Sequence, residues 1–267
     1  MILEKQAPIE NAMPYGCVLT LPATGSEMNN GSVVSRRAQG AKLYFTHPKV
    51  FPQFSILDPT TTYSLPLKQV GNGVVDAFTH VMEQYLTYPV SARLQDRFAE
   101  SILQTLIEIG PQTLSHPLDY GIRSDFMWCT SWALNGLLGS GVPQDWTTHM
   151  IGHELTAKYG LDHAQTLAIV LPTVMRYKQA AKHEKLLQYA QRVWHITSGS
   201  DAQRIDHCIA NTRQFFEAMG LKTTLAGYGI TPDIAALIDQ LKQHDRTHLG
   251  ERGDITLTDC EGILRMC

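Results

Sequence analysis

The pattern of hydrophobic and polar residues changes character near residue 66. Before Pro66, apolar residues come in short runs separated by turn residues, which is typical of strands. After Pro66, they recur every three or four residues, which is typical of amphipathic helices. The pattern predicts short strands over 17–21, 32–36, 42–45 and 55–57. From residue 67 to the end it predicts a helical chain, with helices over 69–86, 91–109, 123–138, 145–158, 162–182, 183–197, 202–218 and 232–244.

Glycine and proline refine the ends of these helices. Gly110, Gly160 and Gly220 stand where helix C-caps are expected, and Pro172 is expected to kink or split its helix. The predicted fold is mostly α: a helical domain over 67–267, preceded by a short β-containing segment over 1–66. A segment with so few strands and so few helices of its own cannot cover both faces of a parallel sheet. We therefore expect the remnant of a larger α/β domain, or else an antiparallel hairpin packed on the helices.

Composition narrows the class of protein. The chain has 267 residues, 43% of them hydrophobic and 18% charged, which excludes disorder and indicates one or two domains. With 22 basic and 25 acidic residues and no basic stripe, we expect no nucleic-acid partner. No apolar run is long enough to cross a bilayer, and residues 1–15 lack the apolar segment of a signal peptide. The five scattered cysteines form no CxxC pair, so we expect a reduced, cytoplasmic protein without a membrane partner.

Histidine is the residue type that points to chemistry, because there are eleven and several are clustered. The predicted helix 69–86 is apolar around most of its circumference, but Asp76 and His80 lie one turn apart within it. A buried carboxylate needs a partner, and these two could simply satisfy each other. His149 and His153 share a face of the helix 145–158, and His163 follows Asp162, a predicted N-cap. In isolation, His163 could equally be a surface residue of a first helical turn.

Together, Asp76, His80, His149 and His163 offer one carboxylate and three imidazoles. This donor set suits Zn²⁺ or Fe²⁺ better than Mg²⁺, which prefers oxygen ligands. The stretch around His149 and His153 is not the HExxH motif of a zinc protease, because that motif would require histidine where Ala157 stands.

Four segments stand out together: the loop LPATGSE at 21–27 and the runs NGVVDAFTH at 72–80, HMIGHEL at 149–155 and GLDHAQ at 160–165. They resemble one family, the iron-containing (group III) alcohol dehydrogenases, in the order in which that family has them. Together with GVPQDW at 141–146, they are most similar to its NADPH-dependent aldehyde reductase and butanol dehydrogenase branch. The resemblance covers essentially the whole chain and implies an α/β dinucleotide-binding domain followed by a helical metal-binding domain.

The resemblance also implies roles for particular residues. Asp76, His80, His149 and His163 match the metal ligands, for iron or zinc, and His153 matches a residue of proton relay or substrate contact. Four further residues match positions that bind NADP(H), with NAD(H) as the alternative: Thr20 and Thr24 near the phosphates and ribose, and Asn29 and Lys42 near the nicotinamide. The implied reaction is hydride transfer between this cofactor and a small alcohol or aldehyde.

One departure from the family is large: nothing in the chain matches its Gly-Gly-Gly-Ser loop and the aspartate after it. We therefore expect a truncated cofactor domain and impaired activity. A catalytically inactive, helical metal-binding fragment and a metal-dependent hydrolase with the same four ligands are the alternatives. An apolar sheet edge or face left exposed by the absent part is expected to promote self-association, as a homodimer or otherwise.

Overall fold

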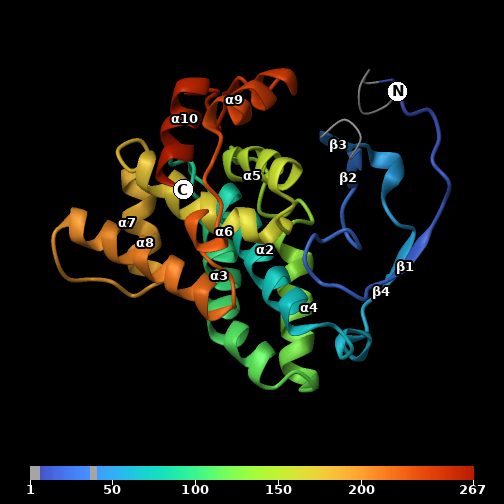
Figure 1. Cartoon of the computed structure of the whole chain (residues 1–267). Helices are drawn as coiled ribbons and strands as arrows, with labels where there is room; N and C mark the ends of the chain where they lie inside the picture. Colours follow the sequence, from blue (N-terminus) through green and yellow to red (C-terminus); the bar gives the residue numbers. More distant parts are fainter. Residues whose placement is uncertain (1–6, 37–40) are drawn as a thin grey trace.

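The computed structural model describes residues 7–36 and 41–267, and Figure 1 shows a helical body with the N-terminal strands along one side. The mostly α fold class is confirmed, and each predicted helix is present with shifted ends. The helices are α2 (Leu67–Tyr85), α3 (Arg93–Ser115), α4 (Tyr120–Ala133), α5 (Thr147–Tyr159), α6 (His163–Tyr177), α7 (His183–Arg192), α8 (Asp201–Ala218), α9 (Ile234–Gln243) and α10 (Leu257–Met266). Short 3-10 turns lie at Pro48–Val50, Pro59–Thr62 and Ala226–Tyr228.

Helix α2 is the centre of the helical body. It packs against α3, α4 and α6, and every residue from Val70 to Tyr85 is buried. A helix that is apolar around most of its circumference is stable only when neighbours cover it on all sides. Phe78 illustrates this packing, because its ring centre lies 5.3 Å from that of Phe215 and 5.4 Å from that of Phe216 on α8. Polar side chains on α2 are therefore enclosed by the fold.

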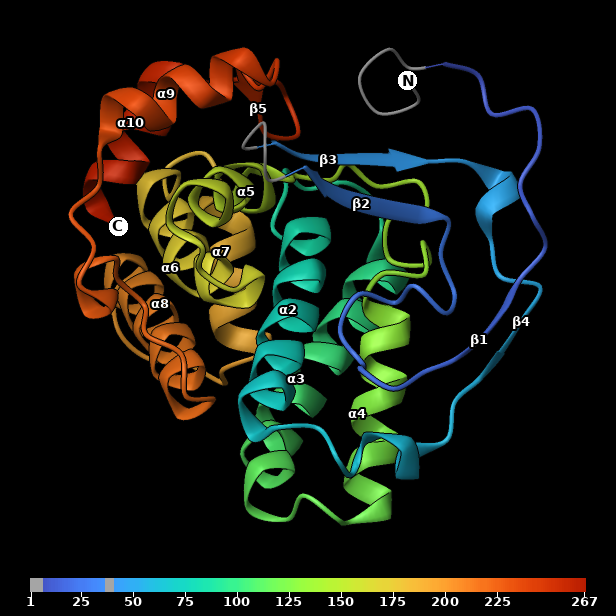
Figure 2. The ribbon, with the colours of Figure 1, turned by 45° about the vertical axis from the view of Figure 1, so that its right-hand side comes forward.

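The N-terminal strands form two separate pairs. Strand β1 (Gly16–Val18) pairs in parallel with β4 (Phe54–Ile56), and β2 (Gly31–Arg36) pairs in antiparallel with β3 (Ala41–Thr46). Figure 2 shows the β2–β3 hairpin beside α5, which β3 contacts. The antiparallel hairpin that was the alternative expectation is therefore present on the helices, beside a separate short parallel pair. The predicted segment 1–66 includes residues 1–6 and 37–40, which lie outside the described part of the chain.

Two expectations about the helices were wrong, and of the kink or split expected at Pro172 the split is absent. Helix α3 does not end at Gly110 but continues to Ser115. Gly110 instead lets α8 approach, because a Cβ there would lie 3.1 Å from the ring of Phe215. Helix α6 is not split, since it runs through Pro172 as one helix. The chain is also not helical throughout after residue 66, because β5 (His248–Leu249) and β6 (Ile255–Thr256) pair before α10.

The helix ends predicted at Gly160 and Gly220 are confirmed. Gly160 caps α5 with a φ of 70°, and Gly220 follows α8 with a φ of 83°. Both conformations lie in the left-handed region, which glycine adopts without steric cost. Asp162 is the N-cap of α6, as predicted, and its main-chain N–H donates to Gln165 Oε1 at 2.9 Å.

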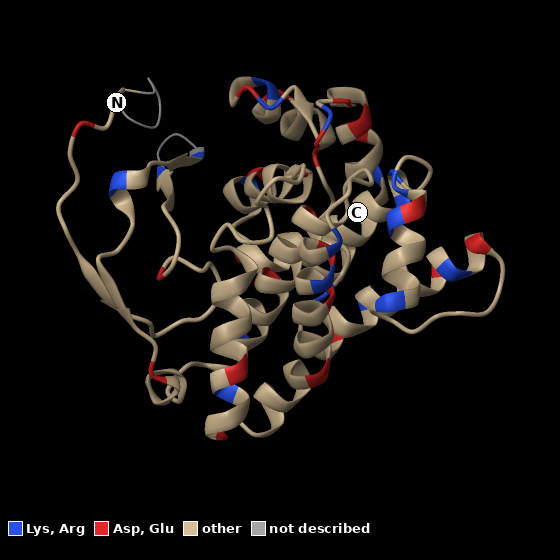
Figure 3. Ribbon diagram, turned by 180° about the vertical axis from the view of Figure 1, so that it is seen from behind, with Lys and Arg blue, Asp and Glu red and all other residues tan. Residues whose placement is uncertain are grey.

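The surface carries two features relevant to partners. On β1 and β4, Val18, Phe54 and Ile56 are 53%, 63% and 50% exposed, so the expected apolar sheet face is present. Acidic and basic residues are interspersed over the helices, as Figure 3 shows, and several pair, including Arg176 with Asp206. Within residues 7–36 and 41–267, no helix combines the length and apolar composition needed to cross a membrane.

Candidate metal centre

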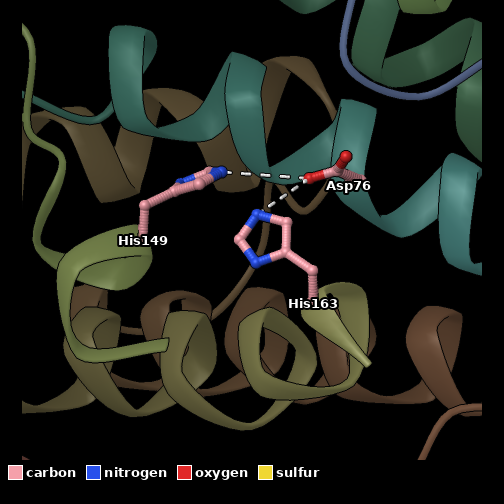
Figure 4. A group of neighbouring side chains, drawn as sticks. All are labelled: Asp76, His149 and His163. Carbon is pink, nitrogen blue, oxygen red and sulfur yellow. Dashed lines mark ion pairs between the residues drawn. The ribbon is translucent and has the colours of Figure 1, made fainter. Parts of the chain in front are cut away.

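Asp76 and three histidines from three helices meet inside the helical body. Asp76 and His80 lie one turn apart on α2, His149 lies in the first turn of α5, and His163 is the first residue of α6. Figure 4 shows the rings of His149 and His163 directed at the Asp76 carboxylate. Their Nε2 atoms lie 3.8 and 3.7 Å from Asp76 Oδ1. The structure thus brings together residues far apart in the sequence.

His80, the fourth predicted ligand, lies beside Asp76 and His149. Its Nε2 atom lies 3.6 Å from Asp76 Oδ1, and its ring stacks on that of His149 with centres 4.7 Å apart. Three ligand atoms, one each from Asp76, His149 and His163, all lie within 4.8 Å of one another. His80 borders this group. Trp146 lies against the His149 ring, edge to face, at 5.3 Å, so the site has an apolar wall.

The geometry of Asp76 fits a shared cation better than internal hydrogen bonds. Asp76 Oδ1 and His149 Nε2 are both buried without a hydrogen-bond partner. At 3.6 to 3.8 Å, the imidazole nitrogens are too far from Oδ1 for hydrogen bonds, so Asp76 and His80 do not simply satisfy each other. Two ligands that each lie about 2.1 Å from one ion are at most about 4.2 Å apart, which these distances satisfy. The carboxylate and imidazole donors suit zinc and iron equally.

The electrostatics keep three of the four groups in the forms that bind a metal. Burial would raise the pKa of Asp76, but the surrounding imidazoles hold it below its usual value. Burial lowers the pKa of His80 to about 4 and that of His163 well below its usual value, despite the opposing effect of Asp76. Near neutral pH, Asp76 is therefore ionised and these two rings are neutral, as metal ligands must be.

Glu83 is a part of the site that sequence reasoning missed. It lies on α2 with a 3% exposed side chain, and its Oε2 atom contacts His149 Nδ1. Burial would lower the pKa of His149, but Glu83 and Asp76 on either side of the ring raise it to about 9. Burial in turn raises the pKa of Glu83, and the contact with His149 opposes this. The available signal was spacing, because Glu83 follows Asp76 by seven residues and lies on the same helical face.

His153 lies beside the metal group, as the resemblance implied. Its ring centre is 5.2 Å from that of His163 and 6.3 Å from that of His149, and burial lowers its pKa well below the usual value. Arg246 Nη2 approaches His153 Nδ1 at 3.5 Å. Because a guanidinium only donates, this contact favours the ring form with its proton on Nε2.

Arg246 and Glu154 form a buried pair that was also missed. Arg246 Nη1 donates to Glu154 Oε1 at 2.6 Å, and Nη2 donates to the main-chain oxygen of Lys42 at 2.9 Å. His244 Nδ1 lies 2.8 Å from the same Glu154 oxygen. This pair ties β3 to α5, and with it Lys42 to the metal centre. No local pattern could have revealed a contact between residues 204 positions apart.

The predicted cofactor residues have different environments. Thr20 and Thr24 are exposed on the loop after β1. Asn29 is engaged within the protein: its Nδ2 donates to the main-chain oxygens of Thr24 at 2.8 Å and Leu134 at 3.2 Å. Lys42 is half-buried, and burial lowers its pKa while Asp76 raises it. Only Lys42 among these four is coupled to the metal centre by a charge interaction that the structure describes.

The chain is similar to known proteins in sequence and in structure. The Fe-containing alcohol dehydrogenase family, C-terminal, matches residues 71–266, and the iron-containing alcohol dehydrogenase family matches residues 1–59. The chain is 59% identical to the NADPH-dependent aldehyde reductase YqhD of Escherichia coli (strain K12) over 250 residues, which are 93% of this chain and 65% of that protein.

Solved structures agree with the sequence comparison. The crystal structure of E. coli K-12 YqhD superposes with a TM-score of 0.95 at 57% identity, over 96% of this chain and 66% of that one. The NADH-dependent butanol dehydrogenase A of Thermotoga maritima gives a TM-score of 0.91 at 27% identity, over 98% of this chain and 67% of that one. The chain thus spans about two thirds of the length of these relatives. With its matched segments and their order, the chain belongs to the iron-containing alcohol dehydrogenase family.

Proposed function

We propose that the chain binds Zn²⁺ or Fe²⁺ through Asp76, His80, His149 and His163. We propose further that it takes part in hydride transfer between NADP(H) and a small alcohol or aldehyde. The observation that carries this proposal is the buried, unpartnered Asp76 Oδ1, with three imidazole nitrogens 3.6 to 3.8 Å away. The names of the relatives support the substrate class, since they are an aldehyde reductase and butanol dehydrogenases.

A bound divalent ion supplies Lewis acidity toward an alcohol or carbonyl oxygen, and a nicotinamide supplies or accepts the hydride. The residues of this chain supply position and charge. Asp76 holds a negative charge beside the neutral rings of His80 and His163, and Trp146 excludes water from one side. His153 holds a proton on Nε2, because Arg246 donates toward its Nδ1. His153 is therefore the residue that we assign to proton exchange with the substrate oxygen.

Lys42 and the choice of cofactor complete the proposal. Arg246 fixes the main chain of Lys42 beside the site, which supports the assignment of Lys42 to the nicotinamide end. The preference for NADP(H) over NAD(H) rests on the relative from E. coli, which is NADPH-dependent, whereas the butanol dehydrogenases are NADH-dependent. We assign residues 1–66 to the cofactor domain and 67–267 to the metal-binding domain, in line with the two matched ranges.

Elemental analysis of the purified chain tests the metal site. We expect about one zinc or iron per chain, and little in Asp76→Asn, which keeps the size of the side chain and removes its charge. Glu100→Gln is the matched control, because Glu100 is another buried carboxylate but interacts with Tyr85 and Arg192 instead. Equal metal content in wild type and Asp76→Asn would refute the site.

A fluorescence titration with NADPH tests the second half of the proposal. Saturable binding that is weakened in Lys42→Ala supports an oxidoreductase. A chain that holds metal but shows no NADPH binding would refute hydride transfer by this chain and leave a helical metal-binding domain. Metal-dependent ester or phosphate hydrolysis without nicotinamide would instead favour the hydrolase alternative.

A further inference from the structure

Glu83 joins the start of α5 to the metal centre through three contacts. Its main-chain oxygen accepts from the N–H of Asp145 at 2.7 Å, its Oε1 accepts from the N–H of Thr148 at 2.6 Å, and its Oε2 contacts His149 Nδ1. We propose that Glu83 is a positioning residue of the metal centre, which caps α5 and fixes the tautomer and orientation of His149. This inference rests on the proposed function, since it assumes that His149 binds a metal.

The capping role follows from what α5 lacks. The N-cap of α5 is Trp146, whose side chain makes no capping hydrogen bond. Asp145 Oδ1 accepts from the N–H of Thr147 at 2.9 Å, and Glu83 accepts from the next N–H, that of Thr148. A carboxylate at the N-terminus of a helix satisfies a free N–H and interacts favourably with the helix dipole. Glu83 thus acts as a cap supplied by a different helix, about one turn from His80 and two turns from Asp76 on α2.

The orienting role follows from the other oxygen of the same carboxylate. A close contact between Glu83 Oε2 and His149 Nδ1 requires a proton between the two atoms. In the neutral ring, this proton on Nδ1 leaves the lone pair of Nε2 on the side that faces Asp76 Oδ1 at 3.8 Å. Nε2 has no hydrogen-bond partner there, although it is buried. A histidine held by a carboxylate on its far nitrogen is the arrangement that orients metal-binding imidazoles in proteins.

Charge balance supports the same assignment. The four proposed ligands carry one negative charge, that of Asp76, against the two positive charges of a Zn²⁺ or Fe²⁺ ion. Glu83 contacts the proposed ligand His149 and is 3% exposed, so its charge would act on a bound ion with little screening by solvent. The two carboxylates together balance the ion inside the helical body, where an uncompensated charge is costly.

Glu83→Gln separates these roles from simple support of the fold. Glutamine has the same size, and its Oε1 can still accept from the N–H of Thr148, so the cap of α5 is retained. Its amide group then presents a donor to His149 Nδ1. This favours the tautomer with the proton on Nε2, where it competes with the metal. Glu83→Asp keeps the charge but is shorter by one methylene, so it cannot reach Thr148 and His149 together.

The experiment measures Zn²⁺ affinity by competition with a chromogenic chelator, in wild type, Glu83→Gln, Glu83→Asp and the control Glu100→Gln. We expect Glu83→Gln to bind Zn²⁺ about 10- to 100-fold more weakly than wild type. Glu83→Asp should be intermediate, and Glu100→Gln unchanged. The visible spectrum of the Co²⁺-substituted proteins gives a readout that stability alone does not move: its ligand-field bands should shift in Glu83→Gln and not in Glu100→Gln.

The outcomes distinguish this inference from the function on which it rests. A wild type that binds no metal refutes the proposed function and this inference with it. A wild type that binds Zn²⁺, with Glu83→Gln of equal affinity and an unchanged Co²⁺ spectrum, refutes the inference alone. An equal loss of affinity in Glu83→Gln and Glu100→Gln also refutes it. If Glu83→Gln does not fold, Glu83→Asp decides, and wild-type affinity in that variant overturns the proposal.

Discussion

Replacing Gly73 by alanine tests how the loop over 22–27 is held on α2. A Cβ at Gly73 would lie 2.3 Å from the main-chain oxygen of Pro22 and 3.1 Å from the ring of Phe126. Gly73 precedes Asp76 by less than one turn of α2. The absence of a side chain therefore lets the loop over 22–27, with its proposed cofactor residue Thr24, lie directly on α2, which carries the proposed metal ligands Asp76 and His80.

The structure sets the size of the effect. Ordinary van der Waals contact begins at 3.4 Å, so the Pro22 oxygen must move by about 1 Å from its 2.3 Å position to admit the methyl group. Overpacking of this kind costs about 1–3 kcal/mol. Alanine gains about 1 kcal/mol over glycine from helix propensity. We expect Gly73→Ala to lower the free energy of unfolding by about 1 kcal/mol, to weaken NADPH binding, and to leave the metal content unchanged.

Urea unfolding and NADPH titration check this expectation, with Gly121→Ala as the matched control. Gly121 lies in the first turn of α4, and a Cβ there would meet Asp119 Oδ1 at 3.4 Å, an ordinary contact. The control should therefore be as stable as wild type or slightly more so. If Gly73→Ala is as stable as Gly121→Ala and binds NADPH as wild type does, the loop is not held by this close approach and the reasoning fails.

Three further predictions concern stability and assembly. Lys182→Met should cost about 3–5 kcal/mol in urea unfolding, because Lys182 Nζ is buried 2.9 Å from Asp145 and 3.0 Å from Glu251; a loss below 1 kcal/mol would contradict this. Lys182 lowers the pKa of Asp145 below 3.8, although burial opposes this shift. The stability that this ion pair contributes is therefore present above pH 3.8 and is lost as the pH falls through the lowered pKa of Asp145. When free metal is at about 100 times its dissociation constant, adding a chelator should lower the melting temperature of the wild type by about 5–10 °C. The same chelator should not change the melting temperature of Asp76→Asn. Light scattering should show self-association that Phe54→Ser reduces, and a monodisperse wild-type monomer would refute a role for the exposed face of β1 and β4.

Much of the site could be predicted because it is local in the sequence. Asp76 and His80 interrupt an otherwise apolar helix at a spacing of one turn, so both side chains had to be buried on one face of α2. Gly160 and Asp162 mark the end of α5 and the start of α6, which placed His163 in a first turn. Periodicity and capping therefore identify the candidate ligands and their elements, donor chemistry groups them, and the resemblance to a family supports that grouping.

The remainder depends on which helical faces meet, and periodicity does not report that. Gly110 shows the ambiguity: a glycine that ends a helix and a glycine that admits a neighbouring helix both lack a side chain for steric reasons, and only the fold distinguishes them. Asn29 shows it at a polar position. Its amide hydrogen bonds to Leu134, 105 residues away, fasten the loop to α4, and nothing local in the sequence indicates that contact.

The contrast among buried carboxylates supports the metal centre more strongly than any single distance. Glu83 contacts His149, Glu154 is bonded to Arg246, and Asp145 lies 2.9 Å from Lys182. Each of these groups has a cationic or donor partner, as a charge inside a protein requires. Asp76 is ionised and equally enclosed, yet the oxygen that faces three imidazoles has no hydrogen-bond partner. Once all three rings are neutral, as metal ligands must be, their lone pairs face that oxygen and do not stabilise its charge. A divalent cation between them satisfies the carboxylate and the rings at once, and this requirement is why removing the charge of Asp76 should abolish metal binding.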